Sequence, residues 1–195
     1  MLRRTIASLF TVVAPFFPNA VRLKRSKERP RIGHDARNSR TFSRVETDMN
    51  PPDEIVRSAS IHWEGDVARG RGSIATESGK VSADYSFGTR FSGDPGTNPE
   101  ELLGASHAAC FTMALSAVLT RAGHAPTSLD STAKVQLSKD GPGFTITSIA
   151  LAVTGVVPGI TQADFEKYAG DAKESCPLSK ALKAVPITLE ATLST

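Results

Sequence analysis

The sequence predicts an α+β fold, and three features of the hydrophobic pattern lead to this class. Short alternating segments occupy residues 58–87, a long apolar helical segment follows over residues 98–121, and further alternating segments flank a second helical one. Hairpin-length turns join most of the strands, which is typical of α+β domains. The 195 residues, 39% of them hydrophobic, are enough for one domain with a single core.

A basic head precedes the patterned region. Residues 1–48 carry 11 Lys and Arg against 4 Asp and Glu, whereas the rest of the chain is net acidic. We expect residues 1–57 to form a disordered extension and residues 58–195 to form the domain. The apolar run over residues 6–14 is too short to span a bilayer. It is either part of a targeting segment for export or organelle import, or part of an extension without function, in which case translation starts at Met49.

The same charge distribution bears on partners and location. A basic tail without a basic face on the folded domain gives no signal for nucleic acid, and no segment predicts a membrane span. The expected location is therefore the cytoplasm, with export or import by the head left open.

The first half of the domain reads as a meander followed by one long helix. The segments ASIHWEGDV, RGSIATES and GKVSADYSF alternate partly and are separated by turns that contain glycine. Asn98 is a suitable helix cap, Pro99 fits the first helical position, and Gly123 marks the end. Because this helix is apolar on nearly every side, we expect it to lie buried at the centre.

The second half predicts a hairpin, a helix and a final strand. STAKVQLSK and FTITSIALAV flank the turn at residues 140–143, and a slip in the alternation indicates a bulge near Thr147 and Ser148. Thr161 caps a helix that runs to about Glu174, and Cys176 before Pro177 ends it. A short helical piece leads to the alternating segment ITLEATL.

The two cysteines, Cys110 and Cys176, allow three interpretations: inert buried thiols, a structural disulfide or a redox pair. The position of Cys176 at a helix-ending kink favours the redox pair. A thiol in a buried helix reacts only as a thiolate, which requires a nearby cation. Arg90 is the candidate cation, and Glu100 or Glu101 could hold its guanidinium in place.

Metal and cofactor chemistry have little support in the sequence. His107 and Cys110 have a spacing that can ligate a metal ion, but no second pair completes a zinc site, so His107 is expected to be a packed or hydrogen-bonded helix residue. No phosphate-binding loop, dinucleotide fingerprint or serine-hydrolase pattern is present. We therefore predict no cofactor and no metal site.

Four segments together resemble the OsmC branch of the OsmC/Ohr proteins, which are bacterial thiol-dependent peroxidases. They are HWEGDVARGRGSIATESG, GTRF, GTNPEELLGASHAACFTMALS and SCPLSKAL, and the resemblance runs from about residue 58 to the C-terminus. It implies an intertwined homodimer in which antiparallel sheets wrap two central buried helices. It also implies that Cys110 is the peroxidatic and Cys176 the resolving cysteine, with Arg90 and Glu100 beside them.

The resemblance further implies reduction of organic hydroperoxides, and of hydrogen peroxide less efficiently, through a Cys110 sulfenic acid and a Cys110–Cys176 disulfide. An external dithiol, such as a dihydrolipoyl protein, would be the reductant. Two other functions stay open: a stress-induced dimer that binds apolar ligands without catalysis, and a thiol redox sensor.

Helix geometry gives a separate expectation about the site. Ten residues of straight helix place Glu100 about 15 Å from Cys110, too far for both to contact one arginine. Either the helix breaks near Gly104, or the two residues of one site come from different chains, and we favour the second arrangement.

Overall fold

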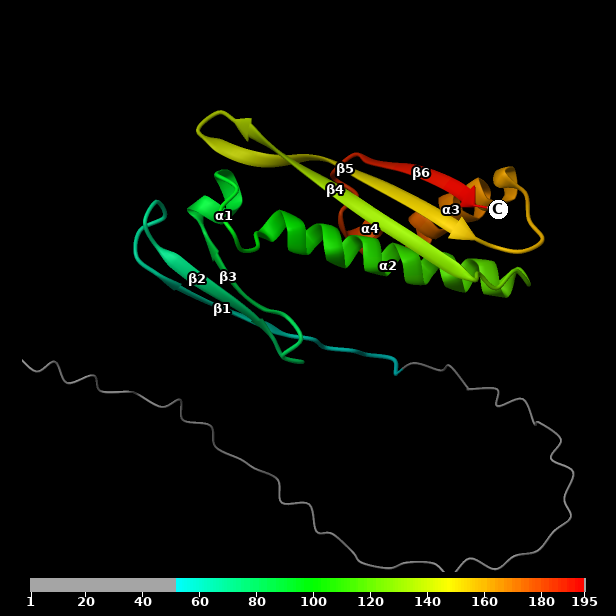
Figure 1. Ribbon diagram of the computed structural model, residues 1–195, viewed down its shortest axis with the longest axis horizontal. Coiled ribbons are helices and arrows are strands. Elements are labelled where there is room, and N and C mark those ends of the chain that lie inside the picture. The colour runs from blue at the N-terminus through cyan, green and yellow to red at the C-terminus, as the bar shows by residue number, and fades with distance from the viewer. Residues whose placement is uncertain (1–51, 195) are drawn as a thin grey trace, which may run out of the picture. The chain divides into compact units, whose positions relative to one another are not determined.

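The computed structural model describes residues 52–194 of the chain (Figure 1). The predicted basic extension over residues 1–57 falls almost entirely on residues outside this range, so its boundaries stay a prediction.

An antiparallel meander opens the described part of the chain, as the sequence predicts. β1 (Ala59–Glu64), β2 (Arg71–Thr76) and β3 (Ser82–Ser86) pair in that order. Ser86 ends β3 and caps the short helix α1 (Phe87–Phe91), accepting a hydrogen bond from the Thr89 N–H. Arg90 therefore belongs to α1, the short helix that follows the third strand.

The long helix α2 (Pro99–Arg121) forms as predicted, with the Asn98 side chain accepting from the Glu101 N–H and with Pro99 in the first turn. One face is buried, and its members recur at helical spacing: Gly104, His107, Phe111, Leu115 and Leu119. The opposite face is exposed, with 74% of Met113 accessible. Burial on nearly every side is therefore wrong for the single chain.

A second sheet supplies the surface on which the helices pack. β4 (Ser128–Asp140) and β5 (Gly143–Val156) form an antiparallel hairpin whose register skips Thr147, which confirms the predicted bulge. β6 (Ile187–Ser194) pairs in parallel with β5, contrary to the antiparallel expectation. The pairing is parallel because the chain between β5 and β6 crosses over through two helices.

Those two helices meet at Cys176. α3 (Gln162–Ser175) begins with Thr161 and Asp164 in a reciprocal capping box, as predicted, and α4 (Pro177–Ala181) follows immediately. α2 packs along β4 and against α3, while α3 also covers β6 (Figure 1). The side chains buried between these elements form the core: Phe111, Leu115, Leu119, Leu151, Val153, Val157, Phe165, Ala169, Ala172 and Cys176.

Glycines allow the closest approaches in this core. A Cβ at Gly104 of α2 would lie 3.0 Å from the Ala133 carbonyl oxygen of β4. A Cβ at Gly155 of β5 would lie 2.5 Å from the Phe165 ring of α3 and 2.9 Å from Leu129. The missing side chains thus set the distance at which the helices pack on the sheet.

Candidate active site

The two cysteines, 66 residues apart in the sequence, come together in the fold. The Sγ atoms of Cys110 and Cys176 lie 3.1 Å apart as free thiols. Cys110 projects from the middle of α2 at the border between its buried and exposed faces, and it is partly exposed. Cys176 is fully buried at the α3–α4 junction, where its N–H donates to the Ala172 carbonyl. Solvent therefore reaches Cys110 more easily than Cys176.

The surroundings of the two thiols shift their pKa values in opposite directions. Burial raises the pKa of Cys110, and the neighbouring Cys176 sulfur raises it further. Burial alone would also raise the pKa of Cys176, but hydrogen bonds to its sulfur outweigh burial and hold that pKa below its ordinary value. The polar groups at the start of α4, which are the Ser179 N–H and hydroxyl and the Leu178 N–H, favour the charged form of this sulfur, as does the neighbouring Cys110 thiol.

The candidate arginine is paired with one of the two acidic residues considered. Arg90 Nε donates to Glu100 Oε2 at 3.0 Å, and Arg90 Nη2 donates to Glu100 Oε1 at 2.5 Å. Partial burial raises the pKa of Glu100, but the hydrogen bonds and charge of Arg90 outweigh it and hold the pKa below its usual value. Glu101 instead accepts from the Thr97 hydroxyl at 3.1 Å.

The arginine pair and the thiol pair lie apart along α2. The helix runs unbroken from Pro99 to Arg121, so it does not break near Gly104. Glu100 and Cys110 are therefore separated by about 15 Å along the helix axis. A guanidinium bound to Glu100 cannot also contact Cys110 of the same helix. Within one chain, the arginine–glutamate pair and the cysteine pair are therefore two separate sites.

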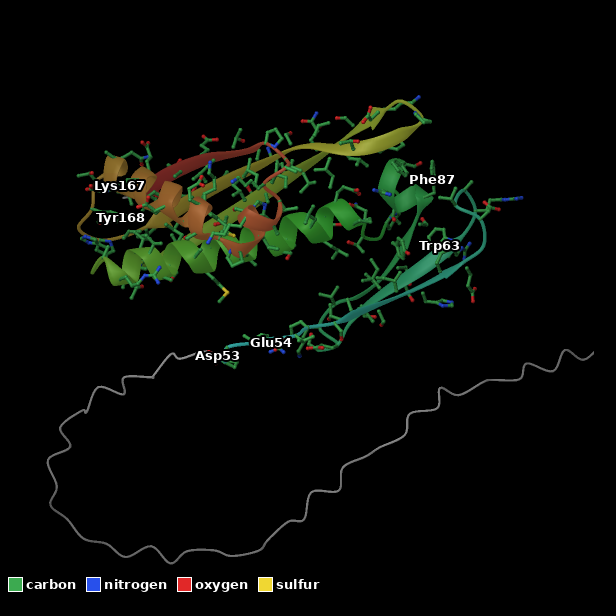
Figure 2. All side chains as sticks on the ribbon, turned by 180° about the vertical axis from the view of Figure 1, so that it is seen from behind. Asp53, Glu54, Trp63, Phe87, Lys167 and Tyr168 are labelled. Carbon is green, nitrogen blue, oxygen red and sulfur yellow. The ribbon has the colours of Figure 1, made fainter. Side chains whose placement is uncertain are left out.

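A cavity of about 220 Å³ lies beside the arginine. Its lining is mostly apolar and comprises Trp63, Val67, Tyr85, Phe87, Phe91 and Pro99, with Ser86 and Arg90. Figure 2 labels Trp63 on the meander and Phe87 at the start of α1. The Phe91 ring packs at a tilt against Phe87 and against Phe144 of the β4–β5 hairpin, with ring centroids 4.8 and 4.9 Å apart. This cavity suits an apolar molecule with one polar group facing the guanidinium.

His107 is a hydrogen-bonded helix residue, as predicted. Its Nε2 lies 2.9 Å from the Ser179 Oγ of α4, and both residues are buried. Ser179 has no local sequence signal of its own; the available hint is that it follows Cys176 by three residues and that His107 precedes Cys110 by three. Within residues 52–194, no group of three or more His, Cys, Asp or Glu is placed to hold a metal ion.

Comparisons with known proteins agree on one family. The chain is 53% identical over 137 residues to peroxiredoxin OsmC of Escherichia coli (strain K12), an alignment that covers 70% of this chain and 95% of that protein. It is 36% identical over 97 residues to the organic hydroperoxide resistance protein OhrA of Bacillus subtilis (strain 168), covering 48% of this chain and 66% of that one.

Solved structures show the same fold. The organic hydroperoxide resistance protein OhrB of Bacillus subtilis superposes with a TM-score of 0.55 at 28% identity, covering 70% of this chain and 98% of that one. An OsmC-like protein from Mycoplasma pneumoniae gives a TM-score of 0.60 at 14% identity, covering 73% of this chain and 99% of that one. The family of OsmC-like proteins matches residues 91–190, a range that holds the paired glutamate and both thiols. The chain therefore belongs to the OsmC-like protein family.

Proposed function

We propose that this protein is a thiol-dependent peroxidase that reduces organic hydroperoxides, with Cys110 as the peroxidatic and Cys176 as the resolving cysteine. The observation that carries the proposal is the 3.1 Å separation of two free thiols. The names of its relatives, a peroxiredoxin and organic hydroperoxide resistance proteins, support the same activity.

The reaction follows from thiol chemistry. The Cys110 thiolate attacks the terminal oxygen of the hydroperoxide, so the O–O bond breaks, the alkoxide takes a proton and leaves as an alcohol, and Cys110 becomes a sulfenic acid. Cys176 then attacks the Cys110 sulfur, releasing water and forming a disulfide. An external dithiol, with dihydrolipoyl proteins as the proposed class, returns both cysteines to thiols. No prosthetic group takes part in these steps.

The different exposures of the two sulfurs support this assignment of roles. Cys110 is partly exposed and can meet a substrate, whereas Cys176 is buried and has Cys110 as its neighbour. The raised pKa of Cys110 means that its thiolate needs a cation, and residues 52–194 of its own chain do not bring one to it. The guanidinium of Arg90, oriented by Glu100, fits this role if it comes from a second copy.

A homodimer would complete the site. The exposed face of α2 carries residues four apart, Ala105, Ala109, Met113 and Ala117. Three of the four are alanines, whose small side chains let helices approach closely. If two copies of α2 packed antiparallel and crossed at Ala105, Glu100 of one would lie opposite Cys110 of the other. Arg90 would then stabilise the thiolate and polarise the hydroperoxide, whose organic part would occupy the aromatic cavity.

The proposed catalytic cycle bears on where the protein works. A cysteine pair that is oxidised in every turnover must be returned to thiols, and a reducing compartment favours that step. The proposed location is therefore the cytoplasm, and the proposed role is defence against oxidative and osmotic stress.

Mass spectrometry tests the proposed function directly. Reduced protein is mixed with one equivalent of cumene hydroperoxide, quenched after a few seconds and mapped by peptides. We expect the loss of two hydrogens and a Cys110–Cys176 link. Cys176→Ser should stop at a sulfenic acid on Cys110 that dimedone traps, and Cys110→Ser should not react.

Two other results would contradict the peroxidase. An unchanged mass with both thiols free would favour a dimer that binds apolar ligands without catalysis. Disulfide formation without sustained hydroperoxide consumption in the presence of dihydrolipoamide would favour a redox sensor.

A further inference from the structure

Two aromatic rings connect Arg90 to the β4–β5 hairpin. Phe91 follows Arg90 in α1, and the guanidinium carbon of Arg90 lies 5.2 Å from the centroid of the Phe91 ring, within the range of a cation–π contact. The Phe144 ring packs against Phe91, with the two centroids 4.9 Å apart. Figure 1 shows the turn end of the hairpin beside α1. The surroundings of Arg90 therefore include a residue from a distant part of the chain.

Phe144 lies near the tip of the hairpin and outside the aromatic cavity. It stands at the start of β5, opposite Lys139 of β4, and 53% of it is exposed. Phe91 belongs to the lining of the cavity of about 220 Å³, whereas Phe144 does not. Phe144 can therefore affect the site through the Phe91 ring, and not by touching a molecule in the cavity.

The Arg90 guanidinium needs support beyond its glutamate. Two hydrogen bonds join it to Glu100, but 35% of the Arg90 side chain is exposed and water competes for these bonds. The Phe91 ring limits the movement of the guanidinium on one side. That ring is packed in turn by Phe87 and Phe144. Phe87 belongs to the same short helix, so Phe144 is the ring that anchors this arrangement to the second sheet.

We propose that Phe144 is a positioning residue, which holds the Phe91 ring against Arg90 and so keeps the guanidinium in its reactive orientation. The proposal rests on the proposed function, in which Arg90 stabilises the thiolate and polarises the hydroperoxide. A donor that is already oriented stabilises the charge that develops during the reaction better than a mobile one. The β4–β5 hairpin thus contributes to catalysis although it carries neither a cysteine nor an arginine.

The mobility of the Arg90 guanidinium tests the proposal without a peroxide. The ¹H–¹⁵N heteronuclear NOE of the arginine Nε–H groups is measured on the reduced full-length protein at pH 6, and the Arg90 signal is assigned by its loss in Arg90→Lys. We expect Phe144→Leu to lower the NOE of Arg90 toward that of the exposed Arg121. Phe144→Tyr, which keeps the ring, should leave it near the parental value.

A neighbouring residue of the hairpin provides the matched control. Thr145 adjoins Phe144, and its hydroxyl donates to Asp140 within the hairpin at 3.0 Å. Thr145→Val therefore disturbs the hairpin without removing the ring, and it should leave the NOE of Arg90 unchanged. An unchanged NOE in folded Phe144→Leu would overturn the proposal, and so would an equal fall in Thr145→Val.

Steady-state kinetics provides the second readout. In Phe144→Leu, kcat/KM should fall about twofold to fivefold, the loss expected from one weakened cation–π contact. The fall should be the same for cumene hydroperoxide and hydrogen peroxide, because both need the oriented guanidinium, and Phe144→Tyr should restore both values. A fall for cumene hydroperoxide alone would contradict the proposal. Because the NOE requires no peroxidase activity, failure of the proposed function and failure of this inference give different results.

Discussion

Glu100 and Cys110 face different surroundings although they lie on one unbroken helix, about 15 Å apart along its axis. Glu100 is bound by the Arg90 guanidinium at the start of α2, whereas Cys110 contacts Cys176 near the middle of the same helix. The two pairs are thus held rigidly apart within one chain. A site that uses both must draw them from two chains.

Mixed dimers provide the sharpest check of this arrangement. Neither Arg90→Ala nor Cys110→Ser alone should support peroxidase activity at more than a small fraction of the parental rate. Dimers co-expressed from both variants should recover up to about half of it, because one of their two sites then contains an intact Arg90 and an intact Cys110. Purification through two different tags and a hydroperoxide assay give the answer. No recovery in mixed dimers would place both residues of a site in one chain.

The Arg90–Glu100 pair should make stability depend on pH. The pKa of Glu100 is lowered from 4.5 in the folded protein, so its stabilisation is fully present above that pH and is lost as the pH falls through the folded value. Glu100→Gln should lower the free energy of unfolding by about 1 kcal/mol at pH 6, a value discounted for the 35% exposure of the Arg90 side chain.

Urea unfolding of both proteins at pH 6 and pH 3.5 measures this effect. The difference between them should shrink at the lower pH. Glu101→Gln is the control, because Glu101 accepts from Thr97 and not from Arg90. A difference independent of pH would contradict the pairing.

Substitution of Gly155 should disturb the packing of α3 on β5. The added methyl group would meet the Phe165 ring at 2.5 Å, so Gly155→Ala should destabilise the fold by about 1–3 kcal/mol. Gly170→Ala is the matched change in α3, where a Cβ meets nothing within 4 Å, and it should stabilise the helix by up to about 1 kcal/mol. Thermal unfolding at one fixed protein concentration compares the two; equal effects would contradict the packing argument.

The aromatic cavity should determine the preference among hydroperoxides. Val67 lines the cavity and is 72% exposed, so Val67→Ser should remove apolar contact without disturbing the core. We expect kcat/KM for cumene hydroperoxide to fall about twofold to fivefold, in line with the loss of one or two buried carbons, while that for hydrogen peroxide stays the same. Val81→Ser, at an exposed valine outside the cavity, should change neither. An equal fall for both peroxides would contradict substrate binding there.

Local signals explain what could be predicted from the sequence. Asn98 with Pro99, the Thr161 capping box, the skip at Thr147 and the break at Cys176 depend on neighbouring residues, and the structure confirms all four. The parallel pairing of β6 depends on a crossover and leaves no local pattern. The exposure of one face of α2 in the single chain could not be predicted, because apolar composition does not tell whether the same chain or another covers a face.

The parts of the candidate site differ in the same way. Cys110 and Cys176 lie 66 residues apart in the sequence, so their spacing could not predict that they are in contact. That contact was expected only because the sequence resembles a family with a reactive cysteine pair. The bond between His107 and Ser179 follows only when that approach is known, because each lies three residues from one of the cysteines. The roles of Arg90 and Glu100 in catalysis stay a prediction.

The meeting of α2 with the α3–α4 corner at the two sulfurs has a consequence for the whole fold. A bond between them would close a loop of 66 residues and, in the chain-entropy description, stabilise the folded state by roughly 4 kcal/mol. Oxidation would then link α2 covalently to the α3–α4 crossover, and reduction would break that link. The oxidised protein would therefore resist heat and proteases better than the reduced protein.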